Sequence, residues 1–339
     1  MAIRGFRGVR RWLIIILVAV VLAGVATVWV RRDPMAQAPP GPFGIFLDTK
    51  DADIAARVAQ AQRFEVRYFR STAVQLPAWN GLCSECTAVH RGGLQWVLTV
   101  RNSPNVTSAA GPVDDVAALQ ETVGKVLDKV KPNVVVVENE ENAAKFFTGT
   151  PEEYARELQA VCGVAHARHR LCTNGGILSG TVAWLVYVHY LDTGQRALAA
   201  SFAERALPAT SVAALSRPGG DRDGRARAAL ARRFIEQYRS AGADYLNIHW
   251  YIADGHALEE AVTYLRTHTG LEVMSNEMGQ RNLDPAVTTS LLTTAQRIGM
   301  PIVVWFSVDA RLARSLLNPD GSLRSTGDAF GTYVAAHHT

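Results

Sequence analysis

The chain has 339 residues, 19% of them charged, and a formal net charge of +4. This length is sufficient for a single α/β barrel of about 250 residues with additions. The charge balance gives no indication of a nucleic-acid partner, because no Lys- or Arg-rich tract follows the first 32 residues.

The N-terminal region predicts a membrane anchor. Residues 12–30 carry no charge, and as a helix they are long enough to cross about 30 Å of hydrocarbon. Four arginines precede this segment and two follow it, so residues 1–11 are expected to form a cytoplasmic basic tail and the C-terminal domain to lie outside. A cleaved signal peptide is the alternative, since Ala36-Gln37-Ala38 has the small-x-small pattern of a cleavage site. We therefore expect an extracytoplasmic domain, anchored by residues 12–30 or secreted if they are removed.

Residues 31–42 form a Pro-rich linker, and residues 43–339 are predicted to form one domain. Its apolar runs alternate with amphipathic stretches. The predicted strands are Phe43–Leu47, Phe64–Phe69, Leu94–Val100, Asn133–Asn139, Arg170–Thr173, Asp244–His249, Leu271–Asn276 and Pro301–Phe306. The predicted helices are 51–62, 113–130, 151–168, 224–241, 256–268, 284–298 and 325–336. Eight strands that alternate with helices predict an α/β fold of the (β/α)₈ TIM-barrel type.

Two segments fit this pattern less well. Ser71–Gly93 has no strong helical periodicity, and the stretch between the fifth and sixth strands is longer than one helix requires. There we expect an extra helix over Leu185–Ala206 and a loop over Arg217–Gly224. A doubly wound open sheet is the alternative architecture, but no Gly-rich phosphate turn follows the first strand.

The four cysteines are even in number, which suits an oxidising compartment. Local pairing predicts the disulfides Cys83–Cys86 and Cys162–Cys172. A zinc site made from all four is the alternative, but the Cys83–Cys86 spacing is not repeated in the second pair.

Two glutamates lie where apolar runs end. Glu140 follows the run of valines at 134–137, and Glu277 follows the run that begins at Leu271. Carboxylates placed where buried parallel strands stop emerge at the C-terminal rim of a barrel. Two carboxylates that converge on one cleft are the minimum equipment for cleaving a glycosidic bond.

Several strand ends are similar to those of one clan of retaining TIM-barrel glycosidases, the cellulase- and xylosidase-like enzymes with an acid/base Glu on strand 4 and a nucleophile Glu on strand 7. The matching segments are Asn139-Glu140-Glu141-Asn142, Ser275-Asn276-Glu277-Met278-Gly279, Tyr245–Tyr251 with its His-x-Tyr, the strand-8 segment Ile302–Phe306, Phe64–Arg70 and Asn174-Gly175-Gly176. The resemblance implies that Glu140 is the acid/base and Glu277 the nucleophile. Departures are Glu141 in place of the usual Pro, and Asn276 where Thr or Ser is common.

The remaining site residues are expected to support these two. Arg70 would hold Glu277 ionised, and Tyr251 would hydrogen-bond it. Asn139 would bond a sugar hydroxyl, and Trp305 would stack on a pyranose ring. The substrate-binding residues are therefore Asn139, Arg70, His249, Tyr251 and Trp305, although His249 is equally compatible with a satisfied buried histidine.

Glu138 and Glu141, on either side of Glu140, are not expected to be the catalytic acid/base. Strand alternation places Glu138 on the same face as Glu140, and Glu141 is expected to be solvated or ion-paired.

The sequence thus predicts a retaining glycoside hydrolase with a carbohydrate substrate and with neither a cofactor nor a metal. Two other functions remain open. One is a carbohydrate-binding barrel at the cell surface that has lost turnover. The other is a metal-assisted hydrolase, which would need a cluster of His and Asp at the strand ends, where only His249 is found.

Overall fold

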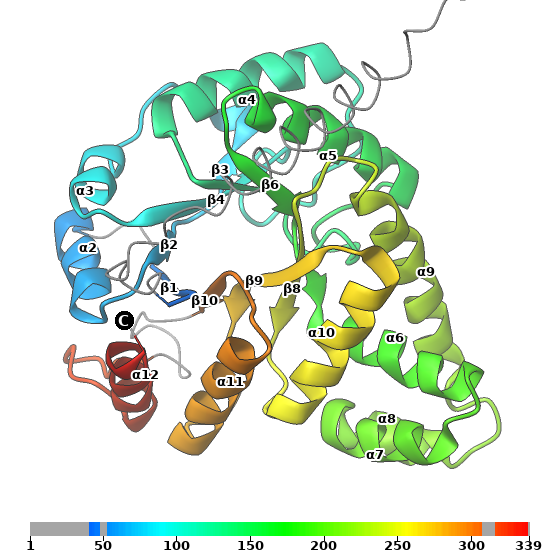
Figure 1. The fold of residues 1–339 in the computed structure, drawn as a ribbon. Coiled ribbons are helices and arrows are strands. Elements are labelled where there is room, and N and C mark those ends of the chain that lie inside the picture. Colours follow the sequence, from blue (N-terminus) through cyan, green and yellow to red (C-terminus); the bar gives the residue numbers. More distant parts are fainter. Residues whose placement is uncertain (1–40, 48–52, 307–315, 338–339) are drawn as a thin grey trace, which may run out of the picture. The chain divides into compact units, whose positions relative to one another are not determined.

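The computed structural model describes residues 41–47, 53–306 and 316–337. Eight parallel strands form a closed barrel, in which each strand pairs with the next along the chain and the last pairs with the first (Figure 1). In chain order they are β1 (Phe43–Phe46), β2 (Tyr68–Arg70), β4 (Gln95–Arg101), β5 (Val134–Val137), β6 (Leu171–Asn174), β8 (Tyr245–Trp250), β9 (Glu272–Met278) and β10 (Val303–Trp305). The predicted barrel of eight strands is confirmed.

Helices surround the strands, as Figure 1 shows for the labelled elements. They are α2 (Ile54–Arg63), α3 (Cys86–Arg91), α4 (Val116–Val130), α5 (Pro151–His166), α6 (Ser179–Asp192), α7 (Arg196–Ala206), α8 (Ala209–Leu215), α9 (Arg222–Tyr238), α10 (Gly255–Thr269), α11 (Pro285–Arg297) and α12 (Ser325–Ala336). Polar caps start several of them at the rim. Thr150 and Glu153 form a capping box at the start of α5, and Asp254 accepts the Ala257 N–H at the start of α10.

The strand residues alternate between two apolar clusters. One fills the barrel interior and contains Tyr68, Val134, Val136, Met274 and Val304 among its members. The other lies between strands and helices and is much larger. Successive side chains of a strand point to opposite faces. The residues that lie in the interior cluster therefore indicate which residues further along each strand point toward the barrel mouth.

The segment between β2 and β4 holds only short elements. They are β3 (Val74–Gln75), a 3-10 turn at Leu76–Ala78, and the six-residue α3. The predicted extra helix over 185–206 is two helices instead, α6 and α7. They are separated at Gly194, whose φ of +77° favours glycine. The predicted loop at 217–224 ends early, because α9 begins at Arg222.

The predicted tail 1–11, anchor 12–30 and nearly all of the linker 31–42 lie outside the described residues. Among the residues that are described, no helix is both long and apolar enough to cross a membrane.

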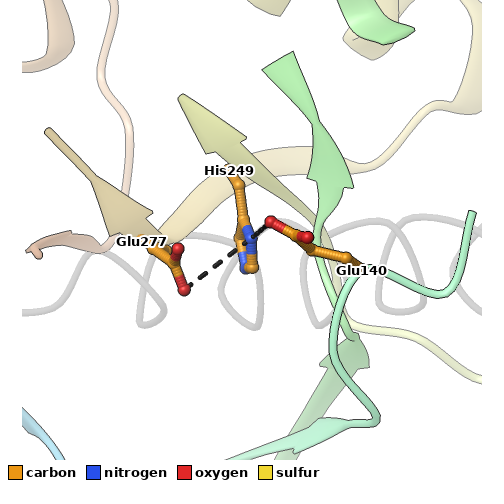
Figure 2. A group of neighbouring side chains, drawn as sticks. All are labelled: Glu140, His249 and Glu277. Carbon is orange, nitrogen blue, oxygen red and sulfur yellow. Dashed lines mark hydrogen bonds and ion pairs between the residues drawn. The ribbon is translucent and has the colours of Figure 1, made fainter. Parts of the chain in front are cut away.

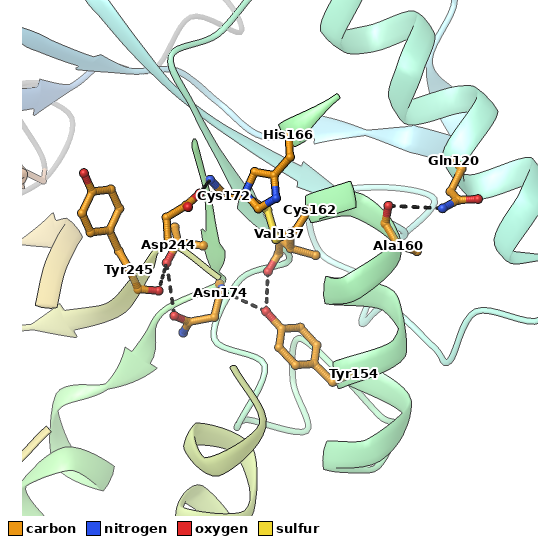
Figure 3. The surroundings of a disulfide bond; sticks show 12 residues. Gln120, Val137, Tyr154, Ala160, Cys162, His166, Cys172, Asn174, Asp244 and Tyr245 are labelled. Atoms are coloured by element: carbon orange, nitrogen blue, oxygen red, sulfur yellow. Dashed lines mark hydrogen bonds and ion pairs between the residues drawn. A yellow bond between two sulfur atoms is a disulfide. The ribbon is translucent and has the colours of Figure 1, made fainter. Parts of the chain in front are cut away.

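Both predicted disulfides are present. Cys162–Cys172 joins α5 to β6, and Figure 3 shows its surroundings. On the same helix, the Tyr154 hydroxyl donates to the Val137 carbonyl at 2.8 Å and accepts the Gly175 N–H at 3.0 Å. Helix α5 therefore fixes the ends of β5 and β6, where the candidate acid/base loop begins.

Candidate active site

Glu277 reaches the barrel mouth because β9 contains a bulge. Asn247 pairs with Met274 and His249 with Glu277, so two steps along β8 correspond to three along β9. The pairing with β10 shows the same shift, from Ser275 to Met278. An extra residue changes the direction of the side chains that follow it, and bulges of this kind occur next to active sites.

The carboxylate of Glu277 is held by Arg70 of β2 and by Tyr251, which directly follows β8. Its Oε2 lies 2.7 Å from Arg70 Nη1, and its Oε1 accepts the Tyr251 hydroxyl at 2.6 Å. Burial opposes ionisation, but His249, Arg70 and the hydrogen bonds from Tyr251 and Arg70 outweigh it and lower the pKa of Glu277 to about 2. Burial and the charge of Glu277 raise the pKa of Tyr251 well above its ordinary value, so the phenol remains a donor. Glu277 is therefore an ionised carboxylate at any ordinary pH.

Glu140 lies in the loop that follows β5, and the loop backbone is strained. Glu138 and Glu140 have φ angles of +65° and +46°, in the left-handed region that costs a non-glycine residue about 1–3 kcal/mol. The loop is held by hydrogen bonds from the Glu140 N–H to the Gly175 carbonyl (3.4 Å) and from the Ala143 N–H to the Glu140 carbonyl (2.8 Å). Strain of this kind is concentrated at functional sites, where surrounding contacts impose it.

His249 lies between the two carboxyl groups, as Figure 2 shows. Its Nδ1 is 2.9 Å from Glu140 Oε1 and 3.7 Å from Glu277 Oε2, and its side chain is fully buried. Burial lowers the pKa of the imidazole, but Glu277 and Glu140 outweigh it, and the pKa of His249 is raised overall. His249 is therefore a buried histidine that contacts both candidate catalytic groups.

Asn139 is also at the mouth, where its Oδ1 accepts from Arg70 Nη2 at 3.3 Å. Arg70 thus joins the Asn139 amide to the Glu277 carboxylate. Of the substrate-binding set predicted from the sequence, the structure brings Asn139, Arg70, His249 and Tyr251 together with the two glutamates.

Trp305 does not belong to the site, and the predicted stacking role is wrong. It is 1% exposed and packs against Phe330 of α12. The next residue, Phe306, is half-buried and stacks on Phe46 with centroids 4.9 Å apart. Phe46 also lies under the Arg70 guanidinium, and Phe306 contacts Tyr251 edge-on. Strand alternation could have predicted Phe306 at the mouth, because Val304 points into the barrel and Phe306 lies two residues further along the strand direction.

The two neighbours of Glu140 also differ from expectation. Glu141 is 1% exposed rather than solvated, and its Oε1 accepts from Asn174 Nδ2 at 2.8 Å and from the Tyr238 hydroxyl. Glu138 does not share the surroundings of Glu140. It is fully buried, pairs with Arg101, and interacts electrostatically with Glu157 of α5. The positive φ at Glu138 breaks the alternation on which the prediction rested.

Glu140, His249 and Glu277 are, within the described part of the chain, the one group of three metal-ligating side chains whose donor atoms lie within 4.8 Å of one another. A bound cation would have to displace the Arg70 guanidinium from Glu277 and the His249 contact from Glu140. We therefore interpret the group as an acid–base network, in which the positive charge next to Glu277 comes from Arg70.

No protein-family model matches the chain, and no curated protein sequence matches it. Solved structures match it over most of its length. A glycoside hydrolase family 128 endo-β-1,3-glucanase from Sorangium cellulosum has a TM-score of 0.53 and 14% identity, over 86% of this chain and 98% of that one. A glycoside hydrolase family 30 subfamily 8 xylanase from Clostridium acetobutylicum has a TM-score of 0.54 and 12% identity, over 88% of this chain and 72% of that one.

A family 128 oligosaccharide-binding protein from Trichoderma gamsii is also similar, with a TM-score of 0.50 and 10% identity, over 90% of this chain and 99% of that one. At such identities the likeness establishes the fold. The chain therefore has the barrel fold found in these glycoside hydrolases and in this binding protein.

Proposed function

We propose that this protein is a retaining glycoside hydrolase that cleaves O-glycosidic bonds by double displacement. The observation that carries the proposal is the spacing of Glu140 and Glu277, each of which has an oxygen within 4.8 Å of the other. Retaining enzymes hold their two carboxyl groups about 5–5.5 Å apart, whereas inverting enzymes need about 6.5–9.5 Å to admit a water molecule.

The two carboxyl groups have the different surroundings that the mechanism requires. Glu277, held ionised by Arg70 and Tyr251, attacks the anomeric carbon while Glu140 gives its proton to the departing glycosidic oxygen. In the second step Glu140 removes a proton from water while the water oxygen attacks the anomeric carbon, which breaks the bond between that carbon and Glu277 and releases the sugar. Glu140 Oε2 suits this exchange, because it has no hydrogen-bond partner among the described residues and the side chain is 13% exposed.

The other residues of the mouth would bind the sugar. Asn139 is placed beside Arg70 and can bond a hydroxyl near the nucleophile, an interaction that strengthens in the transition state. The stacked pair Phe46 and Phe306 replaces Trp305 as the proposed apolar platform, because both rings are half-buried beside Arg70 and Tyr251. The mechanism uses no cofactor.

We propose a polysaccharide or oligosaccharide outside the cytoplasm as the substrate. The apolar segment 12–30 with its heavier N-terminal basic flank supports an anchored protein, and the two disulfides suit an oxidising compartment. The similar structures include enzymes named for β-1,3-glucan and xylan, so these two polymers are the first substrates to test.

A carbohydrate-binding barrel without turnover is the second candidate. It is favoured by the similarity to the oligosaccharide-binding protein and by the replacement of the usual Pro by Glu141. The strained loop and the ionised Glu277 favour the enzyme, because binding alone requires neither.

The test is to incubate the full chain with laminari-oligosaccharides, xylan and a panel of aryl glycosides. We expect cleavage by the wild type and none by Glu277→Gln. Cleavage that is equal in both proteins would overturn the assignment. Sugar binding by the folded wild type without cleavage of any compound would favour the binding barrel.

A further inference from the structure

Three buried asparagines on neighbouring strands connect Glu141 to His249. They are Asn174 of β6, Asn247 of β8 and Asn276 of β9, and each is fully buried. We call them the asparagine ladder. Asn174 Nδ2 donates to Glu141 Oε1 at 2.8 Å, Asn247 Nδ2 donates to Asn276 Oδ1 at 2.7 Å, and Asn276 Oδ1 lies 3.1 Å from His249 Nε2.

Backbone N–H groups fix the direction of the first two amides in the ladder, and the direction of the third follows from the second. The Asn247 N–H donates to Asn174 Oδ1 at 2.7 Å, and the Asn276 N–H donates to Asn247 Oδ1 at 2.9 Å. A backbone N–H can only donate, so each of these side-chain acceptors must be an oxygen. Asn247 therefore presents its NH₂ to Asn276, and the atom of Asn276 that receives it must also be an oxygen.

This direction determines the tautomer of His249. Since Asn276 Oδ1 only accepts, the Nε2 atom that faces it must carry a hydrogen. Gly176, with a φ of +108°, lies against the same ring, and a Cβ there would be 2.3 Å from Cδ2 and Nε2. The imidazole is thus fixed in orientation, and its Nδ1 is the one position at which it gains or loses a proton.

The charged groups that act on this position come from every side of the ring. Glu140 and Glu277 favour a proton at Nδ1, Arg70 disfavours it, and Glu141 adds a weaker attraction. With the proton present, Nδ1–H donates to Glu140 Oε1. The acid proton of Glu140 must then lie on Oε2, the oxygen that has no partner in the described part of the chain. When Nδ1 of His249 carries no proton, the proton of Glu140 moves to Oε1 and hydrogen-bonds to Nδ1, where no substrate can receive it.

We propose that the asparagine ladder positions the catalytic proton: Asn276 holds His249 as the Nε2–H form, and protonated His249 directs the proton of Glu140 to Oε2. The tautomer follows from the hydrogen bonds alone, whereas its consequence for the rate rests on the proposed function. His249 keeps both of its protons through the two chemical steps. The proton that leaves Glu140 Oε2 goes to the glycosidic oxygen, and the one that returns comes from water.

Asn276→Asp is the sharpest variant, because Asn276 Nδ2 has no partner while Oδ1 has two donors. The substitution replaces an unused donor by a charge next to His249 Nε2–H. Asn276→Leu removes the acceptor at similar volume. Asn142→Asp is the matched control, since Asn142 lies two residues beyond Glu140 but bonds Thr181 and Leu178 rather than the ladder.

The first readout is ¹⁵N NMR of the full chain with labelled histidine, with the His249 signals assigned by their loss in His249→Gln. We expect a protonated Nε2 at every pH at which the protein is folded, with titration confined to Nδ1. Asn276→Leu should mix the tautomers, and Asn142→Asp should change nothing. A neutral wild-type His249 protonated at Nδ1 would overturn the proposal, whether or not the protein is an enzyme.

The second readout is the pH–rate profile on whichever substrate is cleaved. Asn276→Asp should move the alkaline limb to higher pH by about one unit or more, because an opposite charge at hydrogen-bond distance favours the imidazolium by that amount. The control should leave this limb in place. An unmoved limb in Asn276→Asp, with the NMR tautomer intact, would overturn the link to catalysis. If no substrate is cleaved, the proposed function fails and the NMR result alone decides the ladder.

Discussion

Glu140 and Glu277 at the barrel mouth form one close pair of glutamates, and Glu138 and Glu157 between β5 and α5 form another, but their electrostatic surroundings are opposite. Glu277 is countered by Arg70, Tyr251 and His249, and its pKa falls to about 2. In the second pair, burial raises the pKa of Glu138 to about 7, although the Asn102 N–H and Arg101 oppose it. Burial and the nearby Glu138 raise the pKa of Glu157 well above its ordinary range. Glu277 thus becomes a reactive group and Glu138 a structural one, depending on whether cationic and hydrogen-bonding partners outweigh burial.

The largest expected loss of activity follows from a substitution of Glu277. Glu277→Gln removes the nucleophile, and we expect a loss of about 10⁴-fold or more in kcat. Glu272→Gln is the matched control, since Glu272 lies on the same strand but is exposed and pairs with Arg266. Initial rates on one substrate measure both. A Glu277→Gln protein within tenfold of wild type would contradict the assignment.

Glu140→Gln should cost less, about 10²–10⁴-fold, because general acid–base catalysis contributes that much. The loss should be smaller on aryl glycosides, whose leaving groups need little protonation. Glu141→Gln is its control and should retain turnover, since Glu141 Oε2 has no partner and a Gln oxygen can still accept from Asn174. Reversed results would move the acid/base assignment to Glu141.

The depressed pKa of Glu277 also predicts a dependence of stability on pH. A carboxyl with a folded pKa of about 2 and an unfolded value of about 4.5 stabilises the fold above pH 4.5, and this contribution is lost as the pH falls toward 2. Wild type should lose about 3 kcal/mol more of its free energy of unfolding between pH 6 and pH 2 than Glu277→Gln does. Denaturant titrations at both pH values measure it, and equal losses would show that Glu277 is not held ionised.

The buried pair should give a pH dependence of the opposite sign. A folded pKa raised to about 7 means that the folded state binds more protons, so this contribution to stability is lost as the pH rises from about 4.5 through 7. Glu157→Gln keeps a polar side chain of similar size but removes the second acid. We expect its free energy of unfolding to fall less than that of wild type between pH 5 and pH 9, because Glu157, whose pKa is also raised, no longer titrates in this range. The same slope in both proteins would contradict the raised pKa of Glu157.

The sequence was sufficient for the barrel because its strands are buried on both faces and appear as continuous apolar runs. The valines at 134–137 and the run at 271–274 placed Glu140 and Glu277 at strand ends, and local spacing gave both cysteine pairs. The break between α6 and α7 was missed because the glycine at 194 is flanked on both sides by good helical patterns.

Side-chain direction was less predictable, because it depends on features that no periodicity shows. The bulge in β9 adds one residue and brings both Asn276 and Glu277 to the site. The prediction assigned the stacking role to Trp305, whereas the ring at the mouth belongs to Phe306. A shift of one position along a strand reverses the face to which a side chain points. The asparagine ladder pairs residues 73 and 29 positions apart, and isolated asparagines in three apolar runs carry no sign of a shared partner.

The most direct test of the central claim, that Glu140 and Glu277 act as a retaining pair, is the configuration of the first product. Wild type should be incubated with a β-glycoside that it cleaves, and the anomeric proton followed by ¹H NMR before mutarotation. We predict that the β-anomer appears first and that Glu277→Gln produces none. An α-anomer as the first product, or the same β-product from Glu277→Gln at the wild-type rate, would contradict the account.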